Sequence, residues 1–313
     1  MIPNRSHALV VTIHAERAAL RPDLLLLGID GGGTRCRARL CAPSGATLGE
    51  AVAGPANIRL GLENSLAAVR EATRDCLDQA GLSSQDLPRI TACLALAGAS
   101  EPTDLAAART QTHPFGRTTI TTDAHAACVG AHRGGDGGVI IVGTGTIGWA
   151  ELNGRQYRVG GWGLPVSDEG SGAWLGAEAL RRVLWAYDGR VAWTGLLRGL
   201  FEQFQNDPHA IVRWTFKASP RDFGSLAPRV VEHAARGDAA GVALMQSAAA
   251  HIDKLAARLM ELGVSRLSLV GGLAHFMEPS LSRSTRSRLV PPAGDALDGA
   301  LQLARVAAES IAA

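Results

Sequence analysis

The stretch "GIDGGGTRCRARLCAPSG", residues 28–45, places three successive glycines between two segments of different pattern. An apolar run, Leu24 to Ile29, leads into Asp30 and the glycines. A dinucleotide site or P-loop would begin a helix directly after the glycines. Instead, arginines alternate with apolar residues from Arg35 to Leu40, the period of two that is typical of a half-buried strand. The sequence therefore predicts a strand, a glycine turn and a second strand.

A second copy of this unit follows at "GVIIVGTGTIGWAELNGRQYRVGG", residues 138–161. It again predicts a strand, a glycine turn and a strand, and the pair Asn153-Gly154 then predicts a hairpin turn into another strand. The motif GTGTIG, residues 143–148, matches the G-x-G-x-x-G pattern, but no helix is expected after it, which disfavours a dinucleotide site. The spacing of the two turns is too long for a solenoid repeat and indicates two related domains.

Composition limits the class of protein. A chain of 313 residues, 46% hydrophobic, favours two globular domains. With 31 basic and 29 acidic residues there is no large basic field, so we expect a small-molecule ligand and neither nucleic acid nor a membrane as partner. The five cysteines contain no C-x-x-C, which disfavours a disulfide framework or a zinc ribbon and predicts reduced, mostly buried thiols.

The start of the chain shows no secretory pattern. Its apolar stretch, Ala8 to Ile13, is shorter than a signal-peptide core and is followed by charged residues. We therefore expect a cytoplasmic protein in which residues 1–23 form an N-terminal extension.

Between and after the two hairpins, the periodicity predicts several further elements. These are helices at 63–80 and 124–132, strands at 90–97, 118–122 and 266–270, a mainly helical region from 173 to about 262, and a terminal helix at 295–308.

Asp123 stands where a predicted strand ends and a helix begins, a position at which α/β sheets place catalytic groups. The same position suits a helix N-cap, and the local sequence favours the cap. His125 and His132 follow closely, but no carboxylate or cysteine completes a metal-ligand spacing. We expect both histidines to be exposed or hydrogen-bonded rather than metal-bound.

The stretch "GGWGLPVSDEGSGAWLG", residues 160–176, is too rich in glycine to be core. Ser167 or Asp168 could cap the helix that follows. A carboxylate beside Trp162 in a loop of accessible backbone would also suit a sugar, and the two interpretations are compatible. Asn57, in the polar loop 54–61, is uninformative by itself.

Together these features resemble one family. The chain resembles the N-acetylglucosamine and glucosamine kinases of the BadF/BadG/BcrA/BcrD ATPase group, within the actin, sugar kinase and Hsp70 fold. The resemblance extends over about residues 24–300, and its most discriminating part is the Trp-Gly to Asp-Glu-Gly-Ser stretch. It rests on residues 28–34, 54–57, 122–123, 143–146, 162–163, 167–171 and 271–272.

The resemblance implies an α/β fold of two actin-like, ribonuclease H-like domains with an interdomain cleft. The first domain would comprise residues 24–131. The second would comprise residues 132–313 with a helical insertion, and whether the terminal helix packs back on the first domain is left open.

The resemblance also implies an ATP-dependent kinase that phosphorylates the 6-hydroxyl of N-acetylglucosamine or glucosamine, with Mg²⁺ held by Asp30. Asp123 would be the general base, which reverses the local preference for a cap. The ATP-binding residues would be Gly31, Gly32, Gly33, Thr34, Gly143, Thr144, Gly145, Thr146, Gly271 and Gly272. The sugar-binding residues would be Asn57, Asp123, Thr144, Trp162, Gly163 and Asp168.

Two alternatives share this fold. An activator-type ATPase of the same group would carry an iron–sulfur cluster on cysteines, and the cysteines here form no such motif. A non-catalytic sugar sensor would not need Asp123, and regulators of the ROK group would add a cysteine-rich zinc motif and a DNA-binding domain. We therefore expect an enzyme whose partners are ATP and an amino sugar. A homodimer and the choice of amino sugar stay open.

Overall fold

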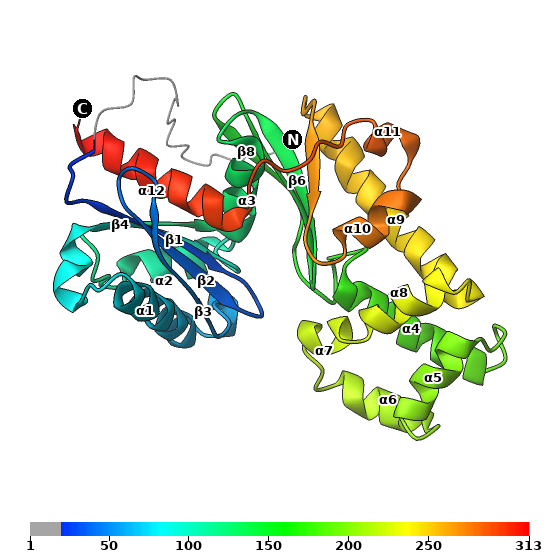
Figure 1. The fold of residues 1–313 in the computed structure, drawn as a ribbon. Helices are drawn as coiled ribbons and strands as arrows, with labels where there is room; N and C mark the ends of the chain where they lie inside the picture. Colours follow the sequence, from blue (N-terminus) through cyan, green and yellow to red (C-terminus); the bar gives the residue numbers. More distant parts are fainter. Residues whose placement is uncertain (1–19, 313) are drawn as a thin grey trace. The chain divides into compact units, whose positions relative to one another are not determined.

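The computed structural model describes residues 20–312, so the apolar stretch at 8–13 and most of the expected N-terminal extension lie outside it. The chain divides into two compact units (Figure 1). The first contains the chain up to Gly138, the segment Trp149–Tyr157 and everything from Pro292; the second contains Val139–Gly148 and Arg158–Pro291. The first unit is thus discontinuous in sequence, whereas the expected domains, 24–131 and 132–313, are each continuous.

The first unit is built on a five-stranded sheet in the order β3-β2-β1-β4-β5. The first two strands are antiparallel, as the predicted hairpin around the glycines requires, whereas β1 runs parallel to β4 and β4 runs parallel to β5. The strands are β1 (Leu25–Gly31), β2 (Cys36–Cys41), β3 (Thr47–Ala53), β4 (Ile90–Leu96) and β5 (Arg117–Thr122).

Helices cover both faces of this sheet. Helix α1 (Leu62–Gln79) packs on β2 and β3, and α2 (Pro102–Thr110) contacts β5. On the other face, α12 (Ala296–Ala312) packs on β1, β4 and α3 (Asp123–His132). In Figure 1 the red α12 runs alongside α3, although the two helices are far apart in sequence.

The alternation along β1 explains this two-sided burial. Leu25, Leu27 and Ile29 belong to the core cluster under α1, whereas Leu26 belongs to the cluster under α12. Because successive side chains of a strand point to opposite faces, a fully apolar strand needs cover on both. The C-terminal helix supplies part of that cover.

The second sheet has four strands in the order β8-β7-β6-β9. They are β6 (Gly137–Val142), β7 (Thr146–Leu152), β8 (Arg155–Gly160) and β9 (Leu267–Val270), so the second predicted hairpin is also present. Asn153 and Gly154 connect β7 to β8 with positive φ angles of 51° and 70°. Positive φ at both positions is what a type I′ turn requires.

The remaining chain of the second unit is helical, as predicted, and prolines begin helices rather than interrupt them. Pro208 and Pro220 each stand at the start of a helix, where the missing N–H costs nothing. The helices are α4 (Gly172–Tyr187), α5 (Gly195–Gln203), α6 (Pro208–Thr215), α7 (Pro220–Gly224), α8 (Ala227–Ala235), α9 (Ala239–Glu261), α10 (Ala274–Met277) and α11 (Arg283–Arg286). Three short 3₁₀ segments complete the chain: η1 (Ile58–Leu60), η2 (Ser84–Arg89) and η3 (Glu278–Ser280).

All five cysteines are free thiols and buried, which confirms their interpretation as reduced core residues. His132 is also buried, and its Nε2 lies 2.8 Å from the Gly138 carbonyl oxygen, so it is a hydrogen-bonded core histidine. None of the helices in the described region is long and apolar enough to span a bilayer.

Candidate active site

The turn between β1 and β2 is hydrogen-bonded at its base and exposed at its tip. The Gly32 N–H donates to the Arg35 carbonyl at 2.9 Å, and the Gly31 carbonyl accepts from the Ala97 N–H at 2.7 Å. At the tip, Gly33 and Thr34 are exposed, and within the described part of the chain their N–H groups donate to no protein acceptor. The tip therefore presents unpaired donors to solvent.

The glycines of this turn serve different purposes. A Cβ on Gly31 would lie 2.7 Å from the Leu96 side chain and 2.9 Å from Ala56, so Gly31 is required by packing. A Cβ on Gly33 would have the Asn57 amide nitrogen, 4.0 Å away, as its nearest neighbour. The protein itself thus leaves room for a side chain at Gly33, and glycine there instead suits a ligand that approaches the backbone closely.

The turn between β6 and β7 repeats this arrangement. Its backbone is closed by the Gly143 N–H donating to the Gly145 carbonyl at 2.9 Å. The carbonyls of Gly143 and Thr144 accept from the first two residues of α4, at 2.8 and 3.1 Å, which fixes the turn against that helix. A Cβ on Gly143 would meet no atom within 4 Å, whereas one on Gly145 would lie 2.6 Å from the Asp168 carboxylate. Gly143 is therefore the open position.

The third glycine pair lies beside this turn. Gly271 has φ of 103°, and a Cβ there would lie 2.5 Å from the Val142 carbonyl oxygen, so the backbone requires glycine. A Cβ on Gly272, in contrast, would meet no atom within 4 Å. The Leu273 N–H donates to the Val142 carbonyl at 3.0 Å. The structure thus brings two of the three predicted nucleotide-binding segments together at neighbouring strands β6 and β9.

Asp168 links the glycine-rich loop that contains Trp162 and Gly163 to the second hairpin. Its Oδ1 accepts from the Gly163 N–H at 3.1 Å, and the Thr146 N–H also binds the carboxylate. Burial raises the pKa of the Asp168 carboxyl, while the Gly163 N–H opposes that rise. The residue has φ of 66°, a left-handed conformation that is uncommon outside glycine. Such a partly buried, constrained carboxylate is typical of functional sites.

Neither Ser167 nor Asp168 caps helix α4, so that part of the sequence prediction is wrong. The N-cap is Ser171, whose Oγ accepts from the Trp174 N–H at 3.1 Å. The Ser167 Oγ instead accepts from the Trp162 N–H at 3.3 Å. Asp168 is consequently available for a role other than capping.

Trp162 is held by Arg158. The guanidinium stacks 3.9 Å from the centre of the Trp162 ring, and its Nε donates to the Gly160 carbonyl at 3.0 Å. A second donor of the same group binds the Gly161 carbonyl. Trp162 is still 64% exposed, so its ring offers an apolar surface to a ligand. Sequence reasoning did not identify Arg158 as the residue that supports this loop.

The cap interpretation of Asp123 is also wrong. Thr122 is the N-cap of α3, and its Oγ1 accepts from the His125 N–H at 2.9 Å. Asp123 is the first residue of the helix, and its Oδ1 accepts from the N–H of Ala124 at 2.9 Å. Thr122 is thus the cap, and Asp123 is an acidic residue in the first turn of the helix.

A buried polar cluster fixes the start of α3. His125 Nδ1 lies 2.7 Å from the Thr121 hydroxyl, and His125 Nε2 lies 3.3 Å from the Glu151 carboxylate and 3.1 Å from the Gln156 side chain. His125 is therefore hydrogen-bonded and buried, in agreement with the sequence-based expectation. The contacts to β7 and β8 had no sequence signal because they depend on tertiary structure.

Asn57 lies beside the first hairpin. Its Oδ1 accepts from the Arg59 N–H at 3.1 Å and so caps the short 3₁₀ segment η1, and its backbone pairs with Ala97. Nδ2 is the atom nearest to a Cβ built on Gly33. The structure thus groups Asp30 to Thr34 and Asn57 in the first unit, near the carboxyl ends of β1 and β4.

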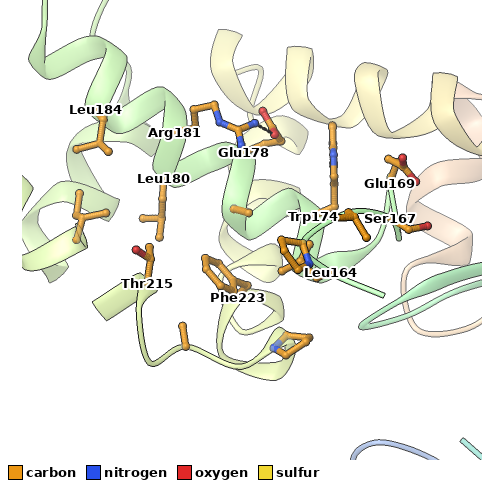
Figure 2. A pocket seen from close by; sticks show the side chains of 16 residues that line it. Leu164, Ser167, Glu169, Trp174, Glu178, Leu180, Arg181, Leu184, Thr215 and Phe223 are labelled. Atoms are coloured by element: carbon orange, nitrogen blue, oxygen red, sulfur yellow. Dashed lines mark hydrogen bonds and ion pairs between the residues drawn. The ribbon is translucent and has the colours of Figure 1, made fainter. Parts of the chain in front are cut away.

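A separate cavity of about 670 Å³ lies within the second unit (Figure 2). Figure 2 shows Trp174 and Leu164 at one side of it and the ion pair of Glu178 and Arg181 at another. Ser167 and Glu169 line the cavity, but Asp168 between them does not. The loop therefore presents neighbouring side chains to different surroundings.

The chain belongs to the BadF/BadG/BcrA/BcrD ATPase family, whose model matches residues 27–283. This confirms the resemblance seen in the sequence. A glucosamine kinase, GspK, of Vibrio cholerae serotype O1 is 41% identical over 89% of this chain and 95% of that protein. An N-acetylmuramic acid/N-acetylglucosamine kinase of Clostridium acetobutylicum is 28% identical over 72% of this chain and 75% of that protein.

Solved structures confirm the fold class. A Chromobacterium violaceum protein described as an N-acetylglucosamine kinase superposes with a TM-score of 0.85 at 34% identity, covering 90% of this chain and 100% of its own. A ROK-family glucokinase of Streptomyces griseus, at 17% identity, superposes with a TM-score of 0.56 over 90% of this chain and 99% of its own, a likeness of fold alone. The protein thus has the α/β, two-domain fold of the actin-like ATPases and sugar kinases.

Proposed function

We propose that this protein is an ATP-dependent kinase that transfers the γ-phosphoryl group to the 6-hydroxyl of an amino sugar, glucosamine or N-acetylglucosamine. The proposal is supported by family membership and by the similarity to a named glucosamine kinase. It places the enzyme in the cytoplasm, where ATP and the sugar would meet.

The observation that carries the proposal is the pair of open glycine turns. Gly33 and Gly143 have room for a Cβ, yet both are glycine, on two hairpins of the same design. The N–H groups of Thr34 and Thr144 at these turns have no protein acceptor among the described residues. Successive backbone N–H groups form anion-binding concavities, and the proposed anion is the phosphate chain of ATP.

Asp123 is the proposed general base. The sugar hydroxyl would give its proton to the Asp123 carboxylate as the hydroxyl oxygen forms its bond to the γ-phosphorus, and the bond to the β-phosphate oxygen would break to release ADP. No covalent enzyme intermediate is required. The support for this assignment is the place of Asp123, directly after β5 ends at Thr122, where α/β sheets place catalytic groups.

The proposed sugar contacts are Asn57, Thr144, Trp162, Gly163 and Asp168, together with Asp123. Trp162 would pack against the apolar face of the sugar ring, and Asp168 would accept hydrogen bonds from sugar hydroxyls. The rigid support of Trp162 by Arg158 and of Asp168 by Gly163 suits a preorganised sugar site.

Mg²⁺ is implied by the family, and the residues present fit it. Mg²⁺ is usually bound through one or two carboxylates plus the phosphates of the substrate and keeps several waters. Asp30 supplies one partly buried carboxylate at the end of β1, next to the proposed phosphate turn. When bound, the cation would neutralise charge on the phosphates.

An ADP-release assay over a panel of hexoses and amino sugars tests the proposal. We expect Mg²⁺-dependent turnover with glucosamine or N-acetylglucosamine and little with glucose. Product analysis by NMR should show the phosphate on the 6-oxygen. Turnover of glucose without turnover of either amino sugar would contradict the assignment.

A further inference from the structure

Arg37 lies directly opposite Asp30 in the antiparallel ladder of β1 and β2. Both side chains are partly buried, with exposed fractions of 26% for Arg37 and 18% for Asp30. Cross-strand partners share one face of the sheet, so the guanidinium meets the carboxylate at close range. What Arg37 does for Asp30 is a question that rests on the proposed function, because Asp30 is its proposed Mg²⁺ residue.

The guanidinium holds a single oxygen of Asp30. Its Nε and Nη2 both donate to Oδ2, at 3.0 and 2.7 Å. The remaining nitrogen, Nη1, donates to Oδ2 of Asp295 at 2.6 Å. Asp295 is itself fixed, since its Oδ1 accepts from the N–H groups of Leu297 and Asp298 at 2.9 and 3.1 Å. Arg37 is therefore anchored at the start of α12 while it grips Asp30.

This grip leaves the two oxygens of Asp30 unequal. Oδ2 is engaged twice, whereas Oδ1 accepts no hydrogen bond from any described residue. Rotating the carboxylate to exchange its oxygens would break both bonds to Arg37. Asp30 thus presents one defined acceptor, Oδ1, at the end of β1.

The geometry points to Arg37 as a positioning residue that orients Asp30 so that Oδ1 alone receives the cation that accompanies ATP, directly or through its water. Partners behind a metal-binding carboxylate fix its orientation, and their loss typically lowers metal affinity or activity by roughly 10–100-fold. Arginine suits this task because its planar fork binds with fixed geometry, whereas a lysine ammonium is a single flexible charge.

Arg39 provides a matched control on the same strand. It is also paired with a carboxylate on a neighbouring strand, Glu50, and its Nη1 donates to Asp298 of α12 at 2.6 Å. It therefore joins β2 to the same helix as Arg37 does. Arg39 forms no hydrogen bond or ion pair with Asp30. Substituting Arg39 therefore removes a contact with α12 but leaves the hydrogen bonds between Arg37 and Asp30 in place.

The experiment compares Arg37→Gln and Arg37→Lys with the control Arg39→Gln. Two quantities are measured: the Mg²⁺ concentration for half-maximal rate at saturating ATP and sugar, and the Mn²⁺ bound in the presence of ADP by electron paramagnetic resonance. We expect Arg37→Gln to raise the Mg²⁺ concentration for half-maximal rate and to weaken Mn²⁺ binding, each by roughly 10–100-fold. Arg37→Lys should change both quantities in the same direction, because a single ammonium cannot reproduce the fixed geometry of the planar guanidinium. Arg39→Gln should stay within about twofold of wild type, as for a substitution that does not touch the site.

If Arg39→Gln weakened Mn²⁺ binding as much as Arg37→Gln, the effect would come from the anchoring of α12 and the inference would be overturned. Unchanged metal dependence in both Arg37 variants would also overturn the inference. Circular dichroism checks folding. If Arg37→Gln is unfolded, the metal dependence of Arg37→Lys, which retains the charge, tests the inference instead. Should the wild type phosphorylate no sugar, the proposed function fails, while Mn²⁺ binding with ADP still tests Arg37.

Discussion

Two aspartates of the candidate site differ in how the protein holds them. Asp123 stands at the start of α3, next to the cap that Thr122 provides. Asp168 is partly buried, and its carboxylate accepts from the backbone N–H groups of Gly163 and Thr146. We infer that Asp123 accepts a proton, whereas Asp168 accepts hydrogen bonds from the sugar. Single substitutions separate these roles because asparagine has the same shape without the charge.

Asp123→Asn should lower kcat by roughly 10²–10⁴-fold, the usual contribution of a positioned general base. The loose transition state of phosphoryl transfer needs little activation of the nucleophile, which favours the lower end of that range. The KM for sugar should change little. Steady-state kinetics measures both quantities.

Thr122→Ala is the matched control for Asp123→Asn. It removes the observed cap and should cost about 1 kcal/mol of unfolding free energy while most turnover is kept. Asp123→Asn should show the opposite pattern, with stability close to wild type. An Asp123→Asn variant that keeps its turnover would remove Asp123 from the catalytic role.

Asp168→Asn should raise the KM for sugar by roughly 10–100-fold, since hydrogen bonds to a charged group contribute about 1.5–3 kcal/mol. Glu169→Gln is the control, because the neighbouring Glu169 lines the separate cavity (Figure 2). Equal effects of the two substitutions would indicate a general charge effect of the loop.

Asp168 should also make stability depend on pH. Burial raises its pKa in the folded state, so as pH rises above about 4 the unfolded chain loses this proton first. The stabilising contribution is thus complete below the unfolded-state pKa and is lost as pH rises through the folded-state pKa. The unfolding free energy of the wild type, minus that of Asp168→Asn, should therefore decrease as pH rises from about 4 to neutral. Urea unfolding at both pH values measures this difference, and a constant difference would contradict it.

At the scale of the element, the two hairpins combine glycines that packing requires with glycines that it does not. Gly31 and Gly271 are enclosed by protein atoms, whereas Gly33, Gly143 and Gly272 are open. The open glycines also lack the positive φ that would demand glycine. Close approach of a ligand to the backbone would account for glycine at these positions, and alanine tests it.

Gly33→Ala and Gly143→Ala should each weaken ATP binding by roughly tenfold or more, because a methyl group would displace the phosphate from a backbone N–H. Their unfolding free energy should stay equal or rise by about 0.4–1 kcal/mol, since alanine restricts the unfolded chain. Calorimetric titration with ATP and thermal melting give the two quantities.

The comparison variant for the hairpins is Gly31→Ala. Its methyl group would crowd Leu96 and Ala56, and such overpacking costs about 1–3 kcal/mol of stability. If Gly33→Ala and Gly143→Ala bound ATP as wild type does, the hairpins would not be phosphate turns.

At the scale of the whole molecule, the end of the chain completes the first unit. Helix α12 approaches α3 so closely that a Cβ on Gly299 would lie 1.9 Å from the Ala126 carbonyl oxygen, and one on Gly130 would lie 1.9 Å from that of Asp295. Glycines on both helices thus allow their backbones to touch. Arg37 and Arg39 add ion pairs from β2 to the start of the same helix.

Gly299→Ala should therefore destabilise the protein by about 1–3 kcal/mol, because backbone atoms of α3 must move to admit the methyl group. Chemical denaturation measures the loss. Gly54→Ala, at a position with no neighbour within 4 Å of the added Cβ, serves as control and should have little effect. A Gly299→Ala variant as stable as wild type would show that the helices can separate at no cost.

Much of the fold could be predicted from local pattern. The alternation after residue 34 predicts a strand and the Asn153-Gly154 pair predicts a turn. Both patterns involve only residues adjacent in the chain, and both hairpins are present. The caps were less accessible, because Thr122 and Ser171 each stand within a few residues of an equally suitable acceptor. Which oxygen reaches the helix N–H depends on the backbone angles that the tertiary structure imposes.

By itself, the sequence determined most of the strands and helices, the buried thiols and the two glycine turns, since each depends on residues close in the chain, but it did not indicate β3 or α2. Only the tertiary structure decided which glycines are open, since that depends on atoms such as those of Leu96 and Asp168 that fold against them. It also placed Arg37 between Asp30 and Asp295, two carboxylates on opposite ends of the chain. Strand register and the return of the terminal helix create that contact, and neither leaves a local pattern in the sequence.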